Sequence, residues 1–199
     1  MRARTFSLVA VMALLPLAVR AQHPGGGDTV GETRAPREAT QYDFLVGQWE
    51  LTVTPKVSGL VGLIHGAPKL RGSWKGTRAL DGWGVEDELR IADESGNPVA
   101  YTHFVRMYDA KAKRWVVSAM DVFRKRATIS AAEWQGGEMV STTDGLDPDG
   151  KAYRTRTRIT DISPAAFRLQ QDVSYDKGAT WDEAHLVIDA KRTSGSASQ

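Results

Sequence analysis

The stretch ATISAAEWQGGEMVSTTDGLDPDGKAYRTRTRIT, residues 127–160, decides the fold class. It contains three runs of β-favouring residues, at 127–134, 138–143 and 151–160, separated by Gly136-Gly137 and by the turn DGLDPDG. Short runs joined by Gly and Asp turns are typical of antiparallel hairpins. In the last run, arginines alternate with uncharged residues, which indicates a strand with one wet face and one covered face.

The same pattern continues on both sides of this stretch. Further β runs are predicted at 49–54, 73–80, 83–91, 101–108, 114–121, 167–175 and 181–190. A single helical turn, at 42–46, is the only helix expected. So many consecutive hairpins must remove their sheet edges, and closure is the simplest way to do so. The sequence therefore predicts an all-β fold, an antiparallel meander closed into a barrel of about ten strands.

The two ends of the chain differ from this core. Residues 1–21 have the pattern of a secretory signal peptide, because Arg2 and Arg4 precede an apolar run too short to span a bilayer comfortably. Residues 22–40 are rich in Gly, Pro and charge and are predicted to be a disordered leader. Residues 41–192 form the predicted barrel domain, and 193–199 a flexible tail. The protein is thus expected to be exported, periplasmic or secreted, with no stable membrane insertion after signal cleavage.

Charge and cysteine content narrow the classes of partner. Removal of residues 1–21 takes away three arginines and no acid, so the 26 basic and 24 acidic residues come close to balance. A near-neutral protein is a poor candidate for nucleic-acid binding, which needs a concentrated basic surface. The absence of cysteine excludes disulfides and lipid attachment at a lipoprotein cysteine. The oligomeric state is left open.

Residues 174–181, SYDKGATW, fit the pattern Ser-x-Asp-x-Gly-x-Thr-Trp, which resembles the Asp-box of sialidases. A propeller of that class carries one box in each blade, and this chain has one copy and is too short for such a fold. Each residue type also suits a tight turn: Asp176 can accept backbone N–H groups, Gly178 can adopt a positive φ, and Trp181 can cover the turn. The stretch is therefore predicted to be a structural hairpin, not a glycosidase site.

The start of the first strand resembles a known superfamily. Gly47-Gln48-Trp49 is similar to the Gly-x-Trp signature of lipocalins and other calycins. That resemblance implies that Trp49 closes one end of the barrel and that a basic residue near the last strand packs over it. Lys191 and Arg192 are the candidates, and Arg192 is the better stacker because its guanidinium is planar.

A wider set of motifs, in order, resembles one family more closely. The set comprises YDFLVGQW at 42–49, YRTR at 153–156, and the Asp-box before the final strand. Together these are similar to the bacterial family called domain of unknown function 1579, which is thought to be lipocalin-like. The resemblance covers roughly residues 42–192 and implies a calycin-like barrel. It implies no activity, since fold alone does not give function.

Noncovalent binding of a small apolar or amphipathic molecule inside the barrel is the favoured function. The residues predicted to line the interior are Trp83, Val85, Leu89, Tyr101, His103 and Val105. The connection VSGLVGLIHGAP, residues 57–68, is unusually apolar, so Leu60, Leu63 and Ile64 are predicted to lie over the mouth. The alternative for this loop is permanent packing on the barrel or a dimer contact.

Three other functions remain open. The chain holds no Gly-x-Ser-x-Gly, phosphate-binding loop or His-Glu-x-x-His, which weighs against an enzyme. A pocket enzyme of the isomerase or cyclase kind would use His103 beside a buried Asp87. A haem-binding barrel would use His103 or His185 as its iron ligand, and no other cofactor is indicated. The last alternative is an interaction-only barrel with a filled core.

No metal site is predicted. No two histidines have the spacing of zinc ligands, and the aspartates of DGLDPDG suit a turn better than a calcium loop. Arg154, Arg156 and Arg158 share one face of their strand. They are expected to pair with acids of adjacent strands such as Asp172, with capture of an anionic head group as the alternative.

Overall fold

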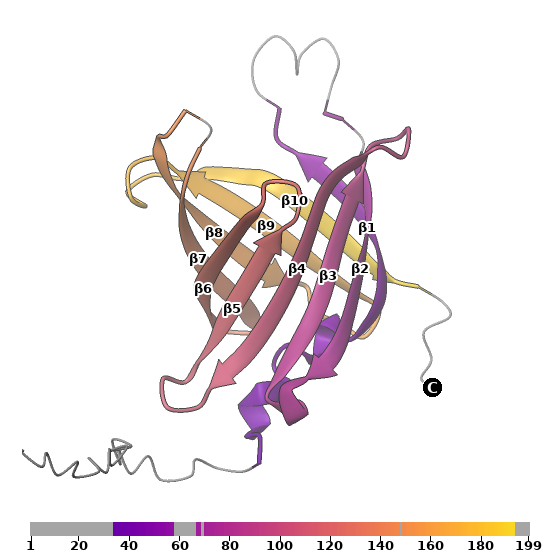
Figure 1. Ribbon diagram of the computed structural model, residues 1–199, viewed down its shortest axis with the longest axis vertical. Helices are drawn as coiled ribbons and strands as arrows, with labels where there is room; N and C mark the ends of the chain where they lie inside the picture. Colours follow the sequence, from indigo (N-terminus) through magenta and orange to yellow (C-terminus); the bar gives the residue numbers. More distant parts are fainter. Residues whose placement is uncertain (1–33, 58–66, 69, 148, 194–199) are drawn as a thin grey trace, which may run out of the picture. The chain divides into compact units, whose positions relative to one another are not determined.

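The computed structural model describes residues 34–57, 67–68, 70–147 and 149–193, and shows ten strands preceded by two short 3-10 turns (Figure 1). The elements are η1 (Arg37–Thr40), η2 (Asp43–Leu45), β1 (Gly47–Pro55), β2 (Leu70–Ala79), η3 (Leu80–Gly82), β3 (Gly84–Ala92), β4 (Pro98–Asp109), β5 (Arg114–Asp121), β6 (Arg126–Gln135), β7 (Glu138–Leu146), β8 (Ala152–Thr160), β9 (Ala166–Ser174) and β10 (Asp182–Arg192).

The ten strands form one closed antiparallel barrel. Each strand pairs with its neighbours in sequence, and β1 closes the ring by pairing with β10 over Trp49↔Arg192 to Pro55↔Leu186. Closure leaves no unpaired edge in the sheet, which is the physical reason that a long meander adopts it. The predicted all-β barrel of about ten strands is confirmed.

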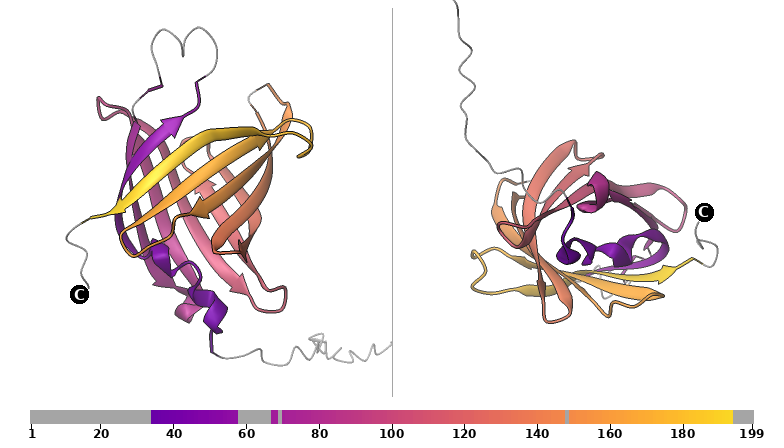
Figure 2. Two further views of the ribbon diagram at one scale, coloured as in Figure 1. Left: turned by 180° about the vertical axis from the view of Figure 1, so that it is seen from behind. Right: turned by 90° about the horizontal axis from the view of Figure 1, so that it is seen from below.

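One end of the barrel is covered by the residues that precede β1. η1 and η2 lie across this opening in the view from below (Figure 2). The helical turn predicted at 42–46 corresponds to η2. The predicted leader extended too far, because η1 occupies residues 37–40 and Ala39 is 1% exposed within the core. Burial of Ala39 and Tyr42 ties this segment to the fold.

The core is concentrated at the covered end. Its largest side chains are Trp49, Trp74, Trp115 and Tyr42, each at most 1% exposed. The close approach of η2 to the barrel wall requires a glycine on β2: a Cβ at Gly76 would lie 2.5 Å from the Leu45 carbonyl oxygen. The closed end is therefore a packed aromatic plug, while the other end has no such plug among the described residues.

Two features are absent from the described residues. No helix in them is long and apolar enough to cross a bilayer. No three His, Asp or Glu side chains in them converge as a group that could hold a metal ion.

Candidate functional site: the open half of the barrel

The floor of the barrel interior is built from rings packed edge to face. The Tyr42 and Trp115 ring centroids are 4.7 Å apart, and those of Trp49 and Phe167 are 4.8 Å apart. The indole N–H of Trp49 donates to the Leu45 carbonyl oxygen at 3.0 Å, so burial leaves no donor unpaired. These contacts fix η2 against β1 and close the lower end rigidly.

Arg192, at the end of β10, lies over Trp49 from the other side. Its guanidinium carbon is 4.0 Å from the ring centroid, and the group donates to the carbonyl oxygens of Pro164 at 2.6 Å and Val46 at 2.8 Å. The structure therefore brings together Trp49 and Arg192, the two residues that the calycin resemblance pairs, while Lys191 is exposed on the opposite face. Gly47, with φ 119°, starts β1 in a conformation that favours glycine.

Above the plug lies a buried ion pair. Arg106 on β4 donates to both carboxylate oxygens of Asp87 on β3, at 2.6 and 3.0 Å, and Trp74 donates to the same carboxylate at 2.8 Å. The Arg106 and Asp87 side chains are 6% and 0% exposed. Burial alone would lower the pKa of Arg106, but the Asp87 carboxylate and Tyr42 raise it, so the guanidinium stays charged. Burial also raises the pKa of Tyr42, although Arg106 opposes that shift.

Beyond this pair, the inner face of β6, β7 and β8 is lined by hydroxyls. Ser130 pairs directly with Val117 of the core, and Ser141 with Ala132, so both serines face inward. The remaining members of this hydroxyl wall are Thr128, Thr143, Thr155 and Thr157. All six are partly exposed, so solvent reaches this part of the interior. No described residue forms a hydrogen bond with the side chain of Ser130 or Ser141. Both serines are partly exposed, so solvent reaches them.

The opposite side of the barrel is apolar. β1, β2 and β3 lie across the ring from β6, β7 and β8 in the closed strand order. Their inward residues in the open half are Val53, Leu70, Leu89 and Ile91. The open half thus offers hydroxyls on one wall and hydrocarbon on the other, which is the combination that binds a molecule with one polar and one apolar side.

Three residues predicted to line the interior are instead on the outer face. The inward residues of β4 are Ala100, Thr102, Phe104, Arg106 and Tyr108, so Tyr101, His103 and Val105 point outward. The prediction was wrong because an arginine in alternation with β-favouring residues normally marks the wet face. Here Arg106 lies inside because Asp87 compensates its charge, and the face that carries Tyr101 and Val105 is the outer one.

The predicted His103–Asp87 pair is therefore also wrong. His103 Nε2 lies 3.0 Å from a carboxylate oxygen of Glu86 and Nδ1 3.9 Å from one of Glu88, both on the outer face of β3. Asp87 is bound to Arg106 on the inside. The two residues are on opposite sides of the sheet, and no His–acid pair faces the interior among the described residues.

The two histidines proposed as iron ligands do not reach the interior. His185 is exposed, and its Nδ1 lies 3.0 Å from Asp182. With His103 also outside, neither residue can ligate a haem held inside the barrel. The third histidine of the fold region, His65, lies outside the described residues.

The remaining predicted lining residues divide by depth. Val85 is fully buried in the plug, and Trp83 lies in the turn between η3 and β3 at the closed end. Leu89 alone lines the open half. Leu60, Leu63 and Ile64 of the proposed mouth loop lie outside the described residues.

The Asp-box stretch forms the tight connection between β9 and β10. Asp176 accepts from the Thr180 N–H at 2.8 Å and its hydroxyl at 2.6 Å, while the Ser174 hydroxyl accepts from the Gly178 N–H at 2.8 Å. These hydrogen bonds, first those from Thr180, hold the pKa of Asp176 at about 2. Gly178 has φ 96°, and Trp181 packs over it. Each of the five residues that define the box, Ser174, Asp176, Gly178, Thr180 and Trp181, has a role in the turn.

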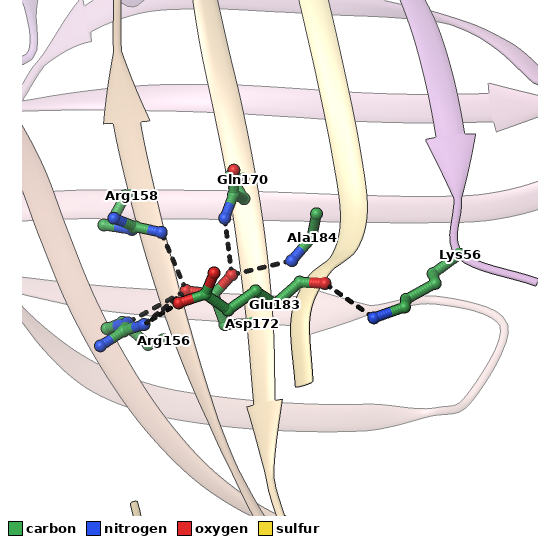
Figure 3. Close-up of polar contacts among 7 residues, drawn as sticks. All are labelled: Lys56, Arg156, Arg158, Gln170, Asp172, Glu183 and Ala184. Carbon is green, nitrogen blue, oxygen red and sulfur yellow. Dashed lines mark hydrogen bonds and ion pairs between the residues drawn. The ribbon is translucent and has the colours of Figure 1, made fainter. Parts of the chain in front are cut away.

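The arginine stripe pairs with acids, as Figure 3 shows for Arg156 and Arg158. Asp172 on β9 accepts from Arg156 at 2.9 and 3.0 Å, from Arg158 at 3.2 Å, from Gln170 at 2.8 Å and from the Ala184 N–H at 3.0 Å. Burial alone would raise the pKa of Asp172, but these hydrogen bonds hold it below its usual value. The third arginine, Arg154, pairs with Asp144, which lies in β7, before the turn itself. The stripe is thus engaged within the protein.

Sequence reasoning missed two components of the interior. It predicted that Val105 lines the interior, which implies an outward Arg106, and it gave no weight to the hydroxyl wall. A signal for the wall was present in β7, where Ser141, Thr142 and Thr143 are consecutive, but three similar residues give no contrast between faces. The inward set became visible only from the pairing with Ala132 and Thr155.

Comparison with known proteins adds information on the fold. No family model matches the chain, and no curated protein matches it in sequence. One solved structure that it resembles is the S-type phycobiliprotein lyase CPES from Guillardia theta, at a TM-score of 0.51 and 11% identity, covering 79% of this chain and 91% of that chain. At this identity the similarity shows a shared barrel fold, and the assignment to the calycins and to domain of unknown function 1579 stays a prediction.

Proposed function

We propose that this protein binds a small amphipathic molecule noncovalently in the open half of its barrel. The observation that carries the proposal is the solvent-reached hydroxyl wall of β6–β8 facing the apolar wall of β1–β3. A barrel selected only for stability would carry hydrocarbon at these six inward positions, because hydroxyls facing inward forgo the free energy of apolar burial.

The two walls set the chemistry expected of the ligand. Ser130 and Ser141 each offer a donor and acceptor that no described residue uses. Across the interior, Leu70 and Leu89 are partly exposed and offer hydrocarbon beside the buried Val53 and Ile91. A ligand with hydroxyl, carbonyl or amide groups along one edge and an apolar opposite edge satisfies both, whereas a purely aliphatic chain leaves the hydroxyls unpaired.

The closed end supports binding rather than passage through the barrel. The plug formed by Tyr42, Trp49, Trp74 and Trp115 leaves one end for entry. The buried Arg106–Asp87 pair lies between plug and hydroxyl wall, and each of its members satisfies the other. Among the described residues, no histidine and no unpaired carboxylate faces the inward hydroxyls, so a carrier or sensor role is favoured over turnover.

The first experiment is native mass spectrometry of protein purified without denaturation from an exporting host. A noncovalent adduct that is lost on unfolding would support the proposal, and its mass would give the class of ligand. The same spectrum tests the predicted export, since cleavage after Ala21 leaves Gln22 as the first residue. Failure of cleavage would refute the signal-peptide prediction without affecting the binding proposal.

A pair of adjacent substitutions tests where the ligand lies. Ser141→Leu fills the inner face of β7, while Thr142→Leu adds the same side chain to the exposed outer face one residue away. The adduct is expected to disappear in Ser141→Leu and to persist in Thr142→Leu. Persistence in both variants, with thermal melts unchanged, would refute binding at the hydroxyl wall.

A further inference from the structure

The hairpin between β5 and β6 carries exposed apolar side chains at the open end of the barrel. Its residues Val122 and Phe123 are 45% and 47% exposed. The Val122 N–H donates to the Tyr101 carbonyl oxygen at 2.9 Å, which holds the hairpin beside β4. Because this hydrogen bond anchors the turn, Phe123 stays about half exposed and forgoes much of the free energy that burial of its ring would contribute. Packing within the barrel therefore does not explain an aromatic residue at this position.

The same hairpin carries three consecutive cations. Arg124, Lys125 and Arg126 are all exposed. Asp121 is the acid of this turn; it accepts from the Arg124 N–H at 3.0 Å and from its guanidinium at 2.7 Å. Among the described residues, Lys125 and Arg126 form no ion pair. The tip therefore has a net positive charge next to its exposed hydrocarbon.

The apolar surface extends from the tip along the outer face of the sheet. Met120, the last outward residue of β5 before the turn, is 49% exposed, and Ile129 on β6 is 75% exposed. Both lie on the outer face, because their neighbours Ala119 and Thr128 face inward. Hydrocarbon and positive charge thus share one rim of the barrel.

We propose that this β5–β6 hairpin docks the protein onto an anionic lipid surface. Phe123 and Val122 insert into the boundary between head groups and acyl chains, while Arg124, Lys125 and Arg126 lie at the level of the anionic head groups. A second copy of the chain is a poorer occupant: two-fold packing of this tip on itself would bring three cations against three cations. An anionic bilayer complements both properties at once.

The opposite end of the barrel provides an internal comparison. The β4–β5 hairpin, at the lower end in Figure 1, carries exposed Lys111, Lys113 and Arg114, and the other residues of its turn are Ala110 and Ala112. It has similar charge and no exposed large apolar side chain in its turn, and the nearest one, Met107 on β4, is 45% exposed. If charge alone attracted the protein to lipid, both hairpins would contribute equally.

The docking surface is independent of whether the barrel holds a ligand. If the proposed function also holds, docking at this rim turns the open half toward the bilayer, where amphipathic molecules reside. The experiment below tests docking alone, and its outcome leaves the mass-spectrometric test of binding unaffected.

The test is co-sedimentation of the purified protein with phosphatidylcholine vesicles that either contain or lack phosphatidylglycerol. Binding to the anionic vesicles only, weakening with added salt, is expected. Lys125→Gln with Arg126→Gln is expected to lower the partition coefficient about 30-fold, since each cation near such a surface contributes about a factor of five. Phe123→Ser is expected to lower it roughly tenfold.

The control is Lys111→Gln with Lys113→Gln, which removes the same charge from the β4–β5 hairpin and should lower binding by less than about threefold. An equal loss in this control, equal binding to neutral vesicles, or no binding to anionic vesicles would overturn the proposal. So would a concentration-dependent dimer that Phe123→Ser abolishes, because the hairpin would then be a self-association surface. Circular dichroism melts verify that each variant is folded.

Discussion

The buried Arg106–Asp87 pair leads to a prediction about coupling. Asp87→Leu leaves a guanidinium that is 6% exposed without its carboxylate, and Arg106→Leu leaves a fully buried carboxylate with Trp74 as its remaining donor. Breaking a buried pair from either side costs about 3–5 kcal/mol, because one charge stays buried without compensation. Each single variant is therefore expected to lose that much of its free energy of unfolding.

The double variant should lose far less free energy of unfolding than the two single variants lose together. With both charges gone, the desolvation penalty disappears, and the main loss is the acceptor of the Trp74 indole N–H, about 1–3 kcal/mol. The free energies of unfolding are expected to be non-additive by about 6 kcal/mol in favour of the double variant.

Urea unfolding followed by tryptophan fluorescence measures all four members of the cycle. The control cycle uses Arg168 and Asp189, a 2.7 Å pair on the outer face whose side chains are 43% and 47% exposed. Replacing these with alanine should give a coupling below about 1 kcal/mol. Equal coupling in the two cycles, or additive losses at Arg106 and Asp87, would refute the claim that the pair is held by mutual compensation.

Three further predictions concern Asp176 in the Asp-box turn, Arg192 over Trp49, and Asp172 beside the arginine stripe. The pKa of Asp176 is about 2 in the folded state and about 3.9 in the unfolded state, so its contribution to stability is complete above pH ~4 and is lost as the pH falls towards 2. Asp176→Ala should therefore flatten the pH dependence of the melting temperature between pH ~4 and ~2. An unchanged slope would contradict this. Arg192→Ala removes the cation over Trp49 and two carbonyl contacts, so urea unfolding should show a loss of about 1–3 kcal/mol, with Arg192→Lys recovering only part of it. Asp172→Asn leaves two guanidiniums without their carboxylate and should destabilise by about 2–4 kcal/mol in the same assay, and a neutral result would show that solvent already screens Arg156 and Arg158.

Sequence alone predicted the strands well, because each is bounded by residues with a strong turn preference. The range predicted for β5, residues 114–121, agrees with the structure, since a charged turn precedes it and Asp121 caps the next turn. Gly136-Gly137 and the Asp-box likewise fix their hairpins, with φ 59° and 98° at the two glycines. The ends of these strands are set by residues of the turns themselves, so they can be predicted from short stretches of sequence.

The faces of the strands were harder to predict, because they depend on partners distant in sequence. Arg106 is inside only because Asp87, nineteen residues earlier, neutralises it. The inward direction of Ser141 follows from its pairing with Ala132, since Ser, Thr and Thr in succession carry no alternation of their own. The interior of the site was therefore beyond a reading of single strands, while the Trp49–Arg192 contact was accessible only through a family resemblance.

The pairing of β1 with β10 has a consequence for biosynthesis. The partner of β1 at the point of closure is β10, which lies more than a hundred residues later in the chain. The barrel therefore cannot close until the ribosome has released residues 182–192. Until then the hydrogen-bonding edge of β1 that β10 later covers is available to other chains, and nascent protein is most vulnerable to aggregation in that interval. A chaperone that holds the emerging chain would act most usefully on β1, and truncation before Asp182 is expected to yield aggregates rather than an open but soluble sheet.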